Sequence, residues 1–249
     1  MQIATQTDGN QPVEKDALNS TANGVKEAPS PADPSNKLRI LCIHGFRTSG
    51  SILAQQIKLA NWGPLIDDIA DLVFVDGPWP AGGKSDVEKK FEGPYYEWYQ
   101  ADADHQEVTG VEEATAHFFE YISLNGPFDG LLGFSQGGVL TAVWISLWEK
   151  GLGQKVPNVS FVIEVGGGRG RANVFQPAYE GAAIQCPSLH FIGEKDPFRS
   201  FGDKLIPLFK DPIIINHPYG HVVPKLGASE GQVLRDFLLK QQKAKITSS

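Results

Sequence analysis

The sequence has few of the residues that mark secreted, metal-binding or membrane-spanning proteins. Only two of its 249 residues are cysteines, Cys42 and Cys186, and each lies within or beside an apolar run. Two such residues predict buried thiols in a reducing compartment rather than a disulfide or a metal site. No run approaches the roughly 18 consecutive apolar residues of a membrane span, so the sequence predicts none.

Positive charge is also scarce. The chain has 22 Lys and Arg residues against 29 Asp and Glu residues, which gives a formal net charge of −7. Such an acidic chain is not expected to bind nucleic acid. The 41% hydrophobic and 20% charged residues are ordinary values for a globular protein, and the length suits one sizeable domain that needs no disulfides.

Residues 1–36 contain few large apolar side chains. They contain no apolar stretch like that of a signal peptide, and they are more acidic than a transit peptide. Because so few apolar groups can offset the entropy of ordering, the sequence predicts a disordered tail over residues 1–36 and one domain over residues 37–249. These features favour a cytoplasmic protein with access to the nucleus at this size.

From residue 37 onward, apolar runs alternate with segments of helical periodicity. Most runs are continuously apolar, as in parallel strands that are covered on both faces. The expected strands lie in residues 38–45, 71–78, 128–135, 159–167, 187–196 and 212–221, and the expected helices in residues 49–70, 108–126, 137–151, 198–210 and 229–245. This order predicts an α/β fold with a doubly wound, mostly parallel sheet of about six strands and helices on both faces.

Residues 79–107 interrupt this alternation. The segment is long, irregular and rich in aromatic residues, which fits an insertion over a ligand site and fits equally a surface loop closed by its own aromatic side chains. In the first interpretation, Trp79, Tyr95, Tyr96 and Trp98 line an apolar pocket. In the second, the same rings pack against one another.

Ser135 lies in the sequence GFSQG, which fits the pattern G-x-S-x-G. The pattern alone is weak, because an ordinary glycine-rich turn can contain a serine. Here it follows an apolar run and precedes a helical segment, which is the context of a nucleophile elbow. The helix would direct its free N–H groups and the positive end of its dipole at the serine.

A serine hydroxyl becomes a nucleophile only beside a base that a carboxylate orients. In α/β-hydrolases these groups follow in the order serine, acid, histidine, each after a later strand. Asp196 and His221 occupy those places, so the sequence predicts a Ser135–Asp196–His221 triad with no metal ion. Phe198, just past the acid, would add to the wall of a substrate pocket.

Other residues compete for two of these roles. His217 lies only four residues before His221, but it abuts a strand, where a packed histidine is more usual. Glu194 and Asp203 are alternative acids, although Asp196 precedes a proline that restricts its loop.

Acyl transfer also requires hydrogen-bond donors for the oxyanion that develops. The backbone N–H of Gln136, directly after the nucleophile, is one candidate donor. The backbone N–H of Phe46, in the turn after the first strand, is the other. His44 in that turn is interpreted as a structural side chain that holds the loop rather than as a proton-transfer group.

Four motifs together resemble the FSH-type serine hydrolase family of the α/β-hydrolase superfamily. They are ILCIHGFRTSG, GLLGFSQGG, HFIGEKDPF and PYGHVVP, within a resemblance that spans about residues 37–240; DGPWP and YYEWY resemble the plant-like members. The resemblance implies the same triad, no cofactor, and carboxylesterase or thioesterase activity on a small-molecule acyl ester or thioester.

The fold does not by itself decide the activity, because unrelated functions share one scaffold. The alternative hypothesis is a ligand-binding or receptor-like protein with little turnover. A lyase or an acyltransferase that uses the same serine is a third.

Overall fold

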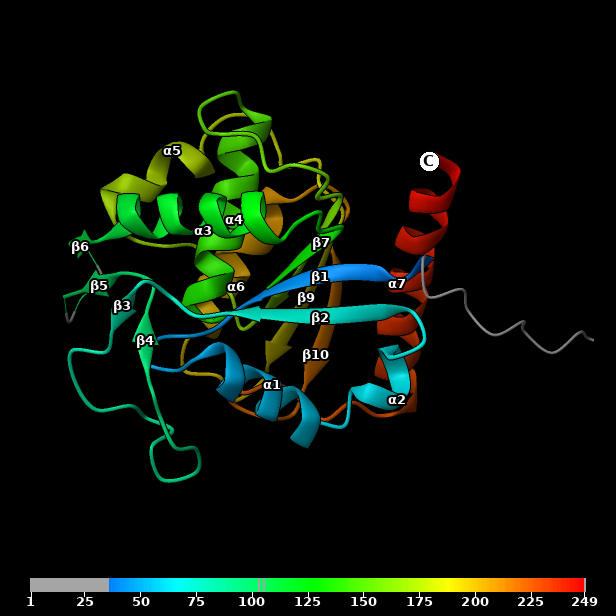
Figure 1. Cartoon of the computed structure of the whole chain (residues 1–249), viewed down its shortest axis with the longest axis horizontal. Coiled ribbons are helices and arrows are strands. Elements are labelled where there is room, and N and C mark those ends of the chain that lie inside the picture. The colour runs from blue at the N-terminus through cyan, green and yellow to red at the C-terminus, as the bar shows by residue number, and fades with distance from the viewer. Residues whose placement is uncertain (1–35, 103, 105, 249) are drawn as a thin grey trace, which may run out of the picture. The chain divides into compact units, whose positions relative to one another are not determined.

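The structure is a computed structural model, which describes residues 36–102, 104 and 106–248. Its centre is a six-stranded sheet with the strand order β10-β9-β8-β7-β1-β2 (Figure 1). All five neighbouring pairs in this sheet are parallel. The strands are β1 (Leu38–Ile43), β2 (Ala70–Val75), β7 (Gly130–Phe134), β8 (Phe161–Val165), β9 (Ser188–Gly193) and β10 (Ile213–His217).

Helices connect these strands. They are α1 (Gly50–Leu59), α2 (Gly63–Ile66), α3 (Val111–Asn125), α4 (Gln136–Glu149), α5 (Gln176–Tyr179), α6 (Arg199–Leu205) and α7 (Ala228–Ser248), with two 3₁₀ turns at Asn173–Phe175 and Ile206–Leu208. Among the helices of the described residues, none has both the length and the apolar character needed to cross a membrane.

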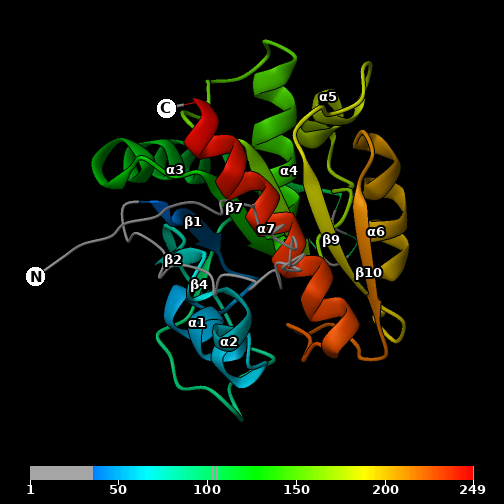
Figure 2. The ribbon, with the colours of Figure 1, turned by 90° about the vertical axis from the view of Figure 1, so that its right-hand side faces the viewer.

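Both faces of the sheet are covered, which explains why its strands are apolar at consecutive positions. In β1, Leu41 and Ile43 belong to one apolar cluster with residues of α3, α4 and α5. Leu38, Ile40 and Cys42 belong to a second cluster with residues of α1, α2 and α7. Figure 2 shows α7 lying across the strands on this second side. The predicted α/β fold, with a parallel sheet of six strands and helices on both faces, is therefore confirmed.

The strand order reverses between β1 and β7. The chain passes from β1 to β2 at one side, returns to β7 on the other side of β1, and then adds β8, β9 and β10 outward. The loops after β1 and β7 consequently leave the sheet in opposite directions, and a crevice opens at the carboxyl ends of these strands.

The segment predicted to be irregular, residues 79–107, contains three short strands, and a fourth follows directly after it. They form two antiparallel pairs, β3 (Trp79–Pro80) with β4 (Tyr96–Glu97) and β5 (Gln100–Ala101) with β6 (Val108–Thr109). The segment also contacts the loop after β1, because Tyr96 donates its backbone N–H to the Thr48 carbonyl oxygen at 2.6 Å.

Both cysteines are free and buried, as the sequence predicted. Burial raises the pKa of the Cys42 and Cys186 thiols far above the ordinary value, so neither is a reactive thiolate. The predicted tail over residues 1–36 lies outside the described residues except for Asn36, and it stays a prediction.

Candidate active site

Ser135 lies between β7 and α4 with a φ of 53°, a left-handed conformation that strains a residue with a side chain. Its backbone N–H donates to the Val165 carbonyl oxygen of β8 at 3.0 Å, which holds the turn. The turn also requires Gly137, because a Cβ there would overlap the Ile43 carbonyl oxygen of β1. The strained turn therefore presents the hydroxyl above the sheet.

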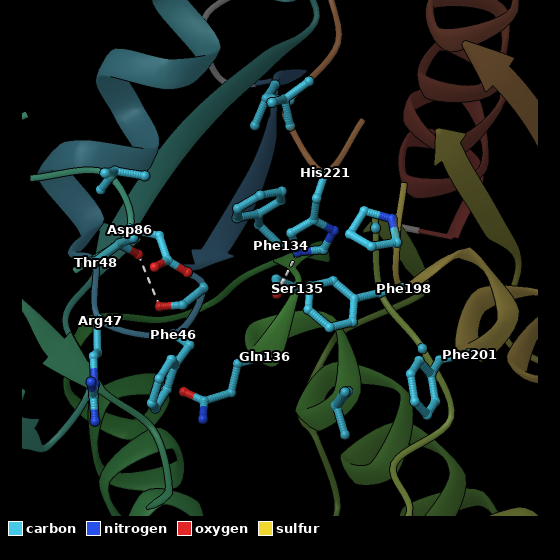
Figure 3. Close-up of a pocket in the computed structure, with 18 of the residues that line it drawn as sticks. Phe46, Arg47, Thr48, Asp86, Phe134, Ser135, Gln136, Phe198, Phe201 and His221 are labelled. Carbon is cyan, nitrogen blue, oxygen red and sulfur yellow. Dashed lines mark hydrogen bonds between the residues drawn. The ribbon is translucent and has the colours of Figure 1, made fainter. Parts of the chain in front are cut away.

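Ser135, His221 and Asp196 form one hydrogen-bonded chain, although they follow three different strands. His221 Nε2 lies 2.8 Å from Ser135 Oγ, and His221 Nδ1 lies 2.7 Å from Asp196 Oδ2. A carboxylate only accepts hydrogen bonds, so Nδ1 carries the proton and Nε2 accepts from the serine hydroxyl. Figure 3 shows Ser135 and His221 facing each other beside Phe198.

Asp196 stays ionised although it is buried. Burial alone would raise its pKa, but the hydrogen bond from His221, the positive charge that this ring can carry and the Phe198 backbone N–H lower the pKa below the ordinary value of 3.8. The Phe198 N–H donates to Asp196 Oδ1 at 2.7 Å, so both carboxylate oxygens are held. A fixed carboxylate can orient the imidazole and stabilise the imidazolium.

The competing residues lie elsewhere. His217 is buried in β10, and burial lowers its pKa against the opposing charges of Asp196 and Glu194. Glu194 is exposed. Asp203 pairs with Arg199 at 3.6 Å on the surface of α6. Among the described residues, only His221 hydrogen-bonds with both Ser135 and a carboxylate.

The two predicted oxyanion donors lie at the same crevice. Gln136 is the first residue of α4, where a backbone N–H has no partner within the helix, and Phe46 lies in the loop after β1. Both residues line the cavity that contains Ser135 (Figure 3). The donor role of their backbone N–H groups stays a prediction.

His44 is fully buried and holds this loop, as expected for a structural residue. Its Nε2 accepts from the Gly77 backbone N–H at 2.9 Å, and its Nδ1 donates to the Gly45 carbonyl oxygen at 2.7 Å. Burial lowers its pKa to about 4, so the ring is neutral near pH 7. His44 thereby joins the loop after β1 to the loop after β2.

A cavity of about 1070 Å³ contains Ser135 and His221 and has a largely apolar lining. Its lining includes Phe198, as predicted, but does not include Trp79, Tyr95, Tyr96 or Trp98.

The four excluded rings make contacts away from the cavity, and Trp98 and Trp79 make theirs with residues outside the insertion. Trp98 is buried among the rings of His44, His117 and Trp144, and Trp79 donates its indole N–H to the Gly110 carbonyl oxygen. Tyr95 donates its hydroxyl to the Phe91 carbonyl oxygen. Tyr96 lies in the β3–β4 pair. The pocket assignment of these four residues was therefore wrong.

The insertion nevertheless contributes to the pocket through residues that the sequence analysis did not select. Phe91 and Tyr99 line the cavity, together with Val139 of α4 and Phe175 after β8. No local pattern distinguishes Tyr99 from its neighbour Trp98. The helical periodicity of α4 could have indicated Val139, which lies one turn after Ser135.

The described residues contain no group of three or more His, Cys, Asp and Glu side chains placed to hold a metal ion.

The sequence matches the family model described as serine hydrolase (FSH1) over residues 34–233. The chain belongs to this serine hydrolase family. The match covers nearly the whole span of the resemblance seen in the sequence, and it includes Ser135, Asp196 and His221.

Curated relatives of this FSH-type serine hydrolase include esterases. It is 32% identical over 226 residues to Esterase OVCA2 of Danio rerio, covering 82% of this chain and 98% of the relative. It is 29% identical over 221 residues to Esterase C25G4.2 of Caenorhabditis elegans, covering 86% and 98% respectively.

Among solved structures, this serine hydrolase resembles the monoacylglycerol lipase of Paleococcus ferrophilus with a TM-score of 0.55. The match covers 82% of this chain and 94% of the lipase at 14% identity, so it supports the fold alone.

Proposed function

We propose that this serine hydrolase cleaves carboxylic esters or thioesters through an acyl-enzyme on Ser135. The observation that carries the proposal is the hydrogen-bonded chain from Ser135 Oγ through the His221 ring to Asp196, with contacts of 2.8 and 2.7 Å. The apolar lining of the adjoining cavity suits the acyl chain. The esterase names of the relatives agree with this activity.

In the first half of the reaction, Ser135 Oγ forms a bond to the substrate carbonyl carbon while its proton passes to His221 Nε2. The carbonyl oxygen becomes an oxyanion, which the backbone N–H groups of Phe46 and Gln136 bind. The intermediate collapses, the carbon–oxygen or carbon–sulfur bond to the leaving group breaks, and His221 returns the proton to the departing alcohol or thiol.

In the second half, water attacks the carbonyl carbon of the acyl-enzyme as His221 takes its proton. The new oxyanion occupies the same donors. Collapse breaks the bond to Ser135, the acid leaves, and the serine regains a proton from His221. Asp196 stabilises the imidazolium in both halves. Every proton is returned, and the proposed steps use only these residues, two backbone N–H groups and water.

Ser135→Ala tests the proposal. Fluorophosphonate labelling and turnover of a 4-nitrophenyl ester should both be lost, with a fall in rate of about 10³-fold or more because no nucleophile remains. Ser123→Ala, at an exposed position of α3, is the matched control and should keep both.

Unimpaired labelling of Ser135→Ala would rule out this serine as the nucleophile. A folded wild type that is neither labelled nor active would instead favour a ligand-binding protein on a hydrolase scaffold. We also propose a cytoplasmic location. The proposed activity includes both oxygen esters and thioesters.

A further inference from the structure

The loop after β8 forms one wall of the cavity. The proposed hydrolysis gives this loop no role. Residues 166–171 have the sequence GGGRGR, and five of the six line the cavity. Two of these five are Arg169 and Arg171, although most of the other lining side chains are apolar. A pair of guanidinium groups is unexpected in a pocket that serves only an alkyl chain.

The first residue of the loop, Gly166, lies beside His221. Gly166 has a φ of 58°, and a Cβ at this position would lie 3.0 Å from His221 Cε1. Three residues of extended chain span at most about 10 Å, so the Cα of Arg169 lies within that distance of the Gly166 Cα. Arg169 and Ser135 line the same cavity, so a substrate that extends from Ser135 along this wall can reach the Arg169 side chain.

Arg169 is held in place by neutral groups. Its Nη2 donates to Gln176 Oε1 at 2.9 Å, and its Cζ lies 5.2 Å from the centre of the Tyr179 ring. Its backbone N–H donates to the Phe201 carbonyl oxygen at 3.0 Å. In the described part of the chain, no carboxylate lies within ion-pair distance of Arg169 or Arg171. The guanidinium is thus ordered and its charge is uncompensated.

The charge of the cavity lining is opposite to that of the whole protein. Arg47 of the lining pairs with the buried Glu97, but the remaining Lys and Arg residues still outnumber the acids, with Lys90, Arg169, Arg171 and Lys225 against Asp86 and Asp102. The whole chain has a formal net charge of −7. A local excess of positive charge in an acidic protein attracts an anion to this opening and not to the surface in general.

We propose that the loop of residues 166–171 is an anion subsite, with Arg169 as its main ligand, and that the enzyme prefers acyl substrates bearing a carboxylate or phosphate. A planar guanidinium binds either group through two parallel hydrogen bonds. The apolar part of the substrate contacts rings such as Phe198 and Phe201. This inference rests on the proposed hydrolase function and deepens it.

Matched substrate pairs test the subsite. The first pair is the 4-nitrophenyl monoester of adipic acid and 4-nitrophenyl hexanoate, which differ by one carboxylate. The second pair is the hexanoyl thioesters of 4′-phosphopantetheine and of pantetheine, which differ by one phosphate. In at least one pair, the kcat/KM of wild type should be about 10-fold or more higher for the anionic substrate than for the neutral one. The pair that shows this preference identifies whether the subsite binds a carboxylate or a phosphate.

Arg169→Gln should remove most of this preference by lowering kcat/KM for the anionic substrate alone. Arg199→Gln is the matched control, because Arg199 lies on α6 outside the cavity lining and pairs with Asp203. The control should keep the preference. Equal rates of wild type on both members of both pairs, or an equal loss on charged and neutral substrates in Arg169→Gln, would overturn the subsite.

A binding measurement separates this inference from the proposed activity. Adipate and coenzyme A are titrated calorimetrically into the Ser135→Ala variant with and without Arg169→Gln. At least one probe should bind, and should bind about 10-fold more weakly when Arg169 is replaced. Binding that depends on Arg169 without turnover by wild type would refute the hydrolase function and retain the anion subsite. Binding of neither probe would refute the subsite.

Discussion

At the scale of single residues, hydrogen bonds hold the groups of the candidate site in one conformation. Ser135 is held in a strained turn by the Val165 carbonyl oxygen, and both oxygens of Asp196 are occupied by the Phe198 N–H and the His221 ring. Because these hydrogen bonds exist before any substrate arrives, little reorganisation is required when charge develops in the reaction. Small changes at these positions should therefore affect rate more than stability.

Asp196→Asn tests the orienting role of the carboxylate. An amide can donate to His221 Nδ1 and so favour the tautomer whose Nε2 carries the proton and cannot accept from Ser135. The kcat for a 4-nitrophenyl ester should fall by about 10³- to 10⁴-fold, while the thermal unfolding midpoint changes by a few degrees. Undiminished kcat would refute the orienting role of Asp196.

Gly166→Ala tests the packing behind His221. The new Cβ would lie 3.0 Å from His221 Cε1 and 3.1 Å from Nδ1, in addition to the strain of a φ of 58°. We expect a loss of about 1–2 kcal/mol in the free energy of unfolding and a fall in kcat of about 10-fold or more, measured by urea denaturation and ester hydrolysis.

Gly181→Ala is its matched control. Gly181 has a φ of 80°, but a Cβ there meets no atom within 4 Å. The control should lose similar stability and keep its kcat. A parallel loss of kcat in both variants would show that backbone strain, and not contact with His221, lowers the rate.

At the scale of elements, the insertion and the site loops support each other. Gln136 accepts from the Trp98 backbone N–H at 2.9 Å through Oε1 and donates to the Tyr99 carbonyl oxygen at 2.7 Å through Nε2. Arg47, directly after the proposed donor Phe46, pairs with the buried Glu97 at 2.7 Å. The insertion is consequently tied to both sides of the predicted oxyanion hole.

Glu97→Ala tests this support. Loss of the carboxylate frees Arg47 and also leaves the Gly82 backbone N–H without its acceptor. We expect kcat for a 4-nitrophenyl ester to fall by about 10-fold because the Phe46 N–H is displaced, with a loss of about 1–3 kcal/mol in unfolding free energy.

Glu97→Gln keeps an acceptor oxygen and should recover part of the rate. Glu92→Ala removes an exposed acid of the same insertion and should change neither quantity. If all three variants kept the wild-type kcat, the tie between insertion and site loop would have no role in the reaction.

At the scale of the whole molecule, one buried acid in the central sheet should make the free energy of unfolding depend on pH. Glu164 of β8 accepts from Thr141 Oγ1 at 2.7 Å through Oε1, and its Oε2 has no hydrogen-bond partner among the described residues. Burial raises the pKa of Glu164 from 4.5 to about 8, against the opposing hydrogen bond from Thr141. The folded protein therefore holds a proton here that the unfolded chain releases above its ordinary pKa.

The sign of the resulting pH dependence follows from this difference. Between about pH 4.5 and 8 the folded state binds more protons, so the Glu164 contribution to the free energy of unfolding falls as pH rises and levels off above about 8. Each pKa unit is worth about 1.4 kcal/mol. Glu164→Gln cannot titrate, so urea denaturation from pH 5 to 9 should show its stability rising relative to wild type up to about pH 8 and then levelling off. Parallel profiles would contradict the raised pKa.

Much of the fold and the three residues of the hydrogen-bonded chain could be predicted from the sequence because their signals are local. Continuously apolar runs separated by helical periodicity predict a covered parallel sheet, and all six expected strands form. Ser135 stands in a glycine pattern at a strand-to-helix junction, and Asp196 and His221 each follow a later strand. Parallel strands carry the ends of distant segments to one edge, so this order along the chain already placed the three residues together.

The lining of the pocket was decided by the tertiary structure alone. In the insertion, two adjacent aromatic side chains point into different environments. Tyr99 lines the cavity, while Trp98 packs against His44 and Trp144. An irregular segment has no periodicity that assigns its side chains to a face, so their directions depend on contacts such as those of Gln136, which lies 37 residues beyond Tyr99 in the sequence. The uncompensated charge of Arg169 is likewise a property of its neighbours in space, because the sequence shows only a glycine-rich turn with two arginines.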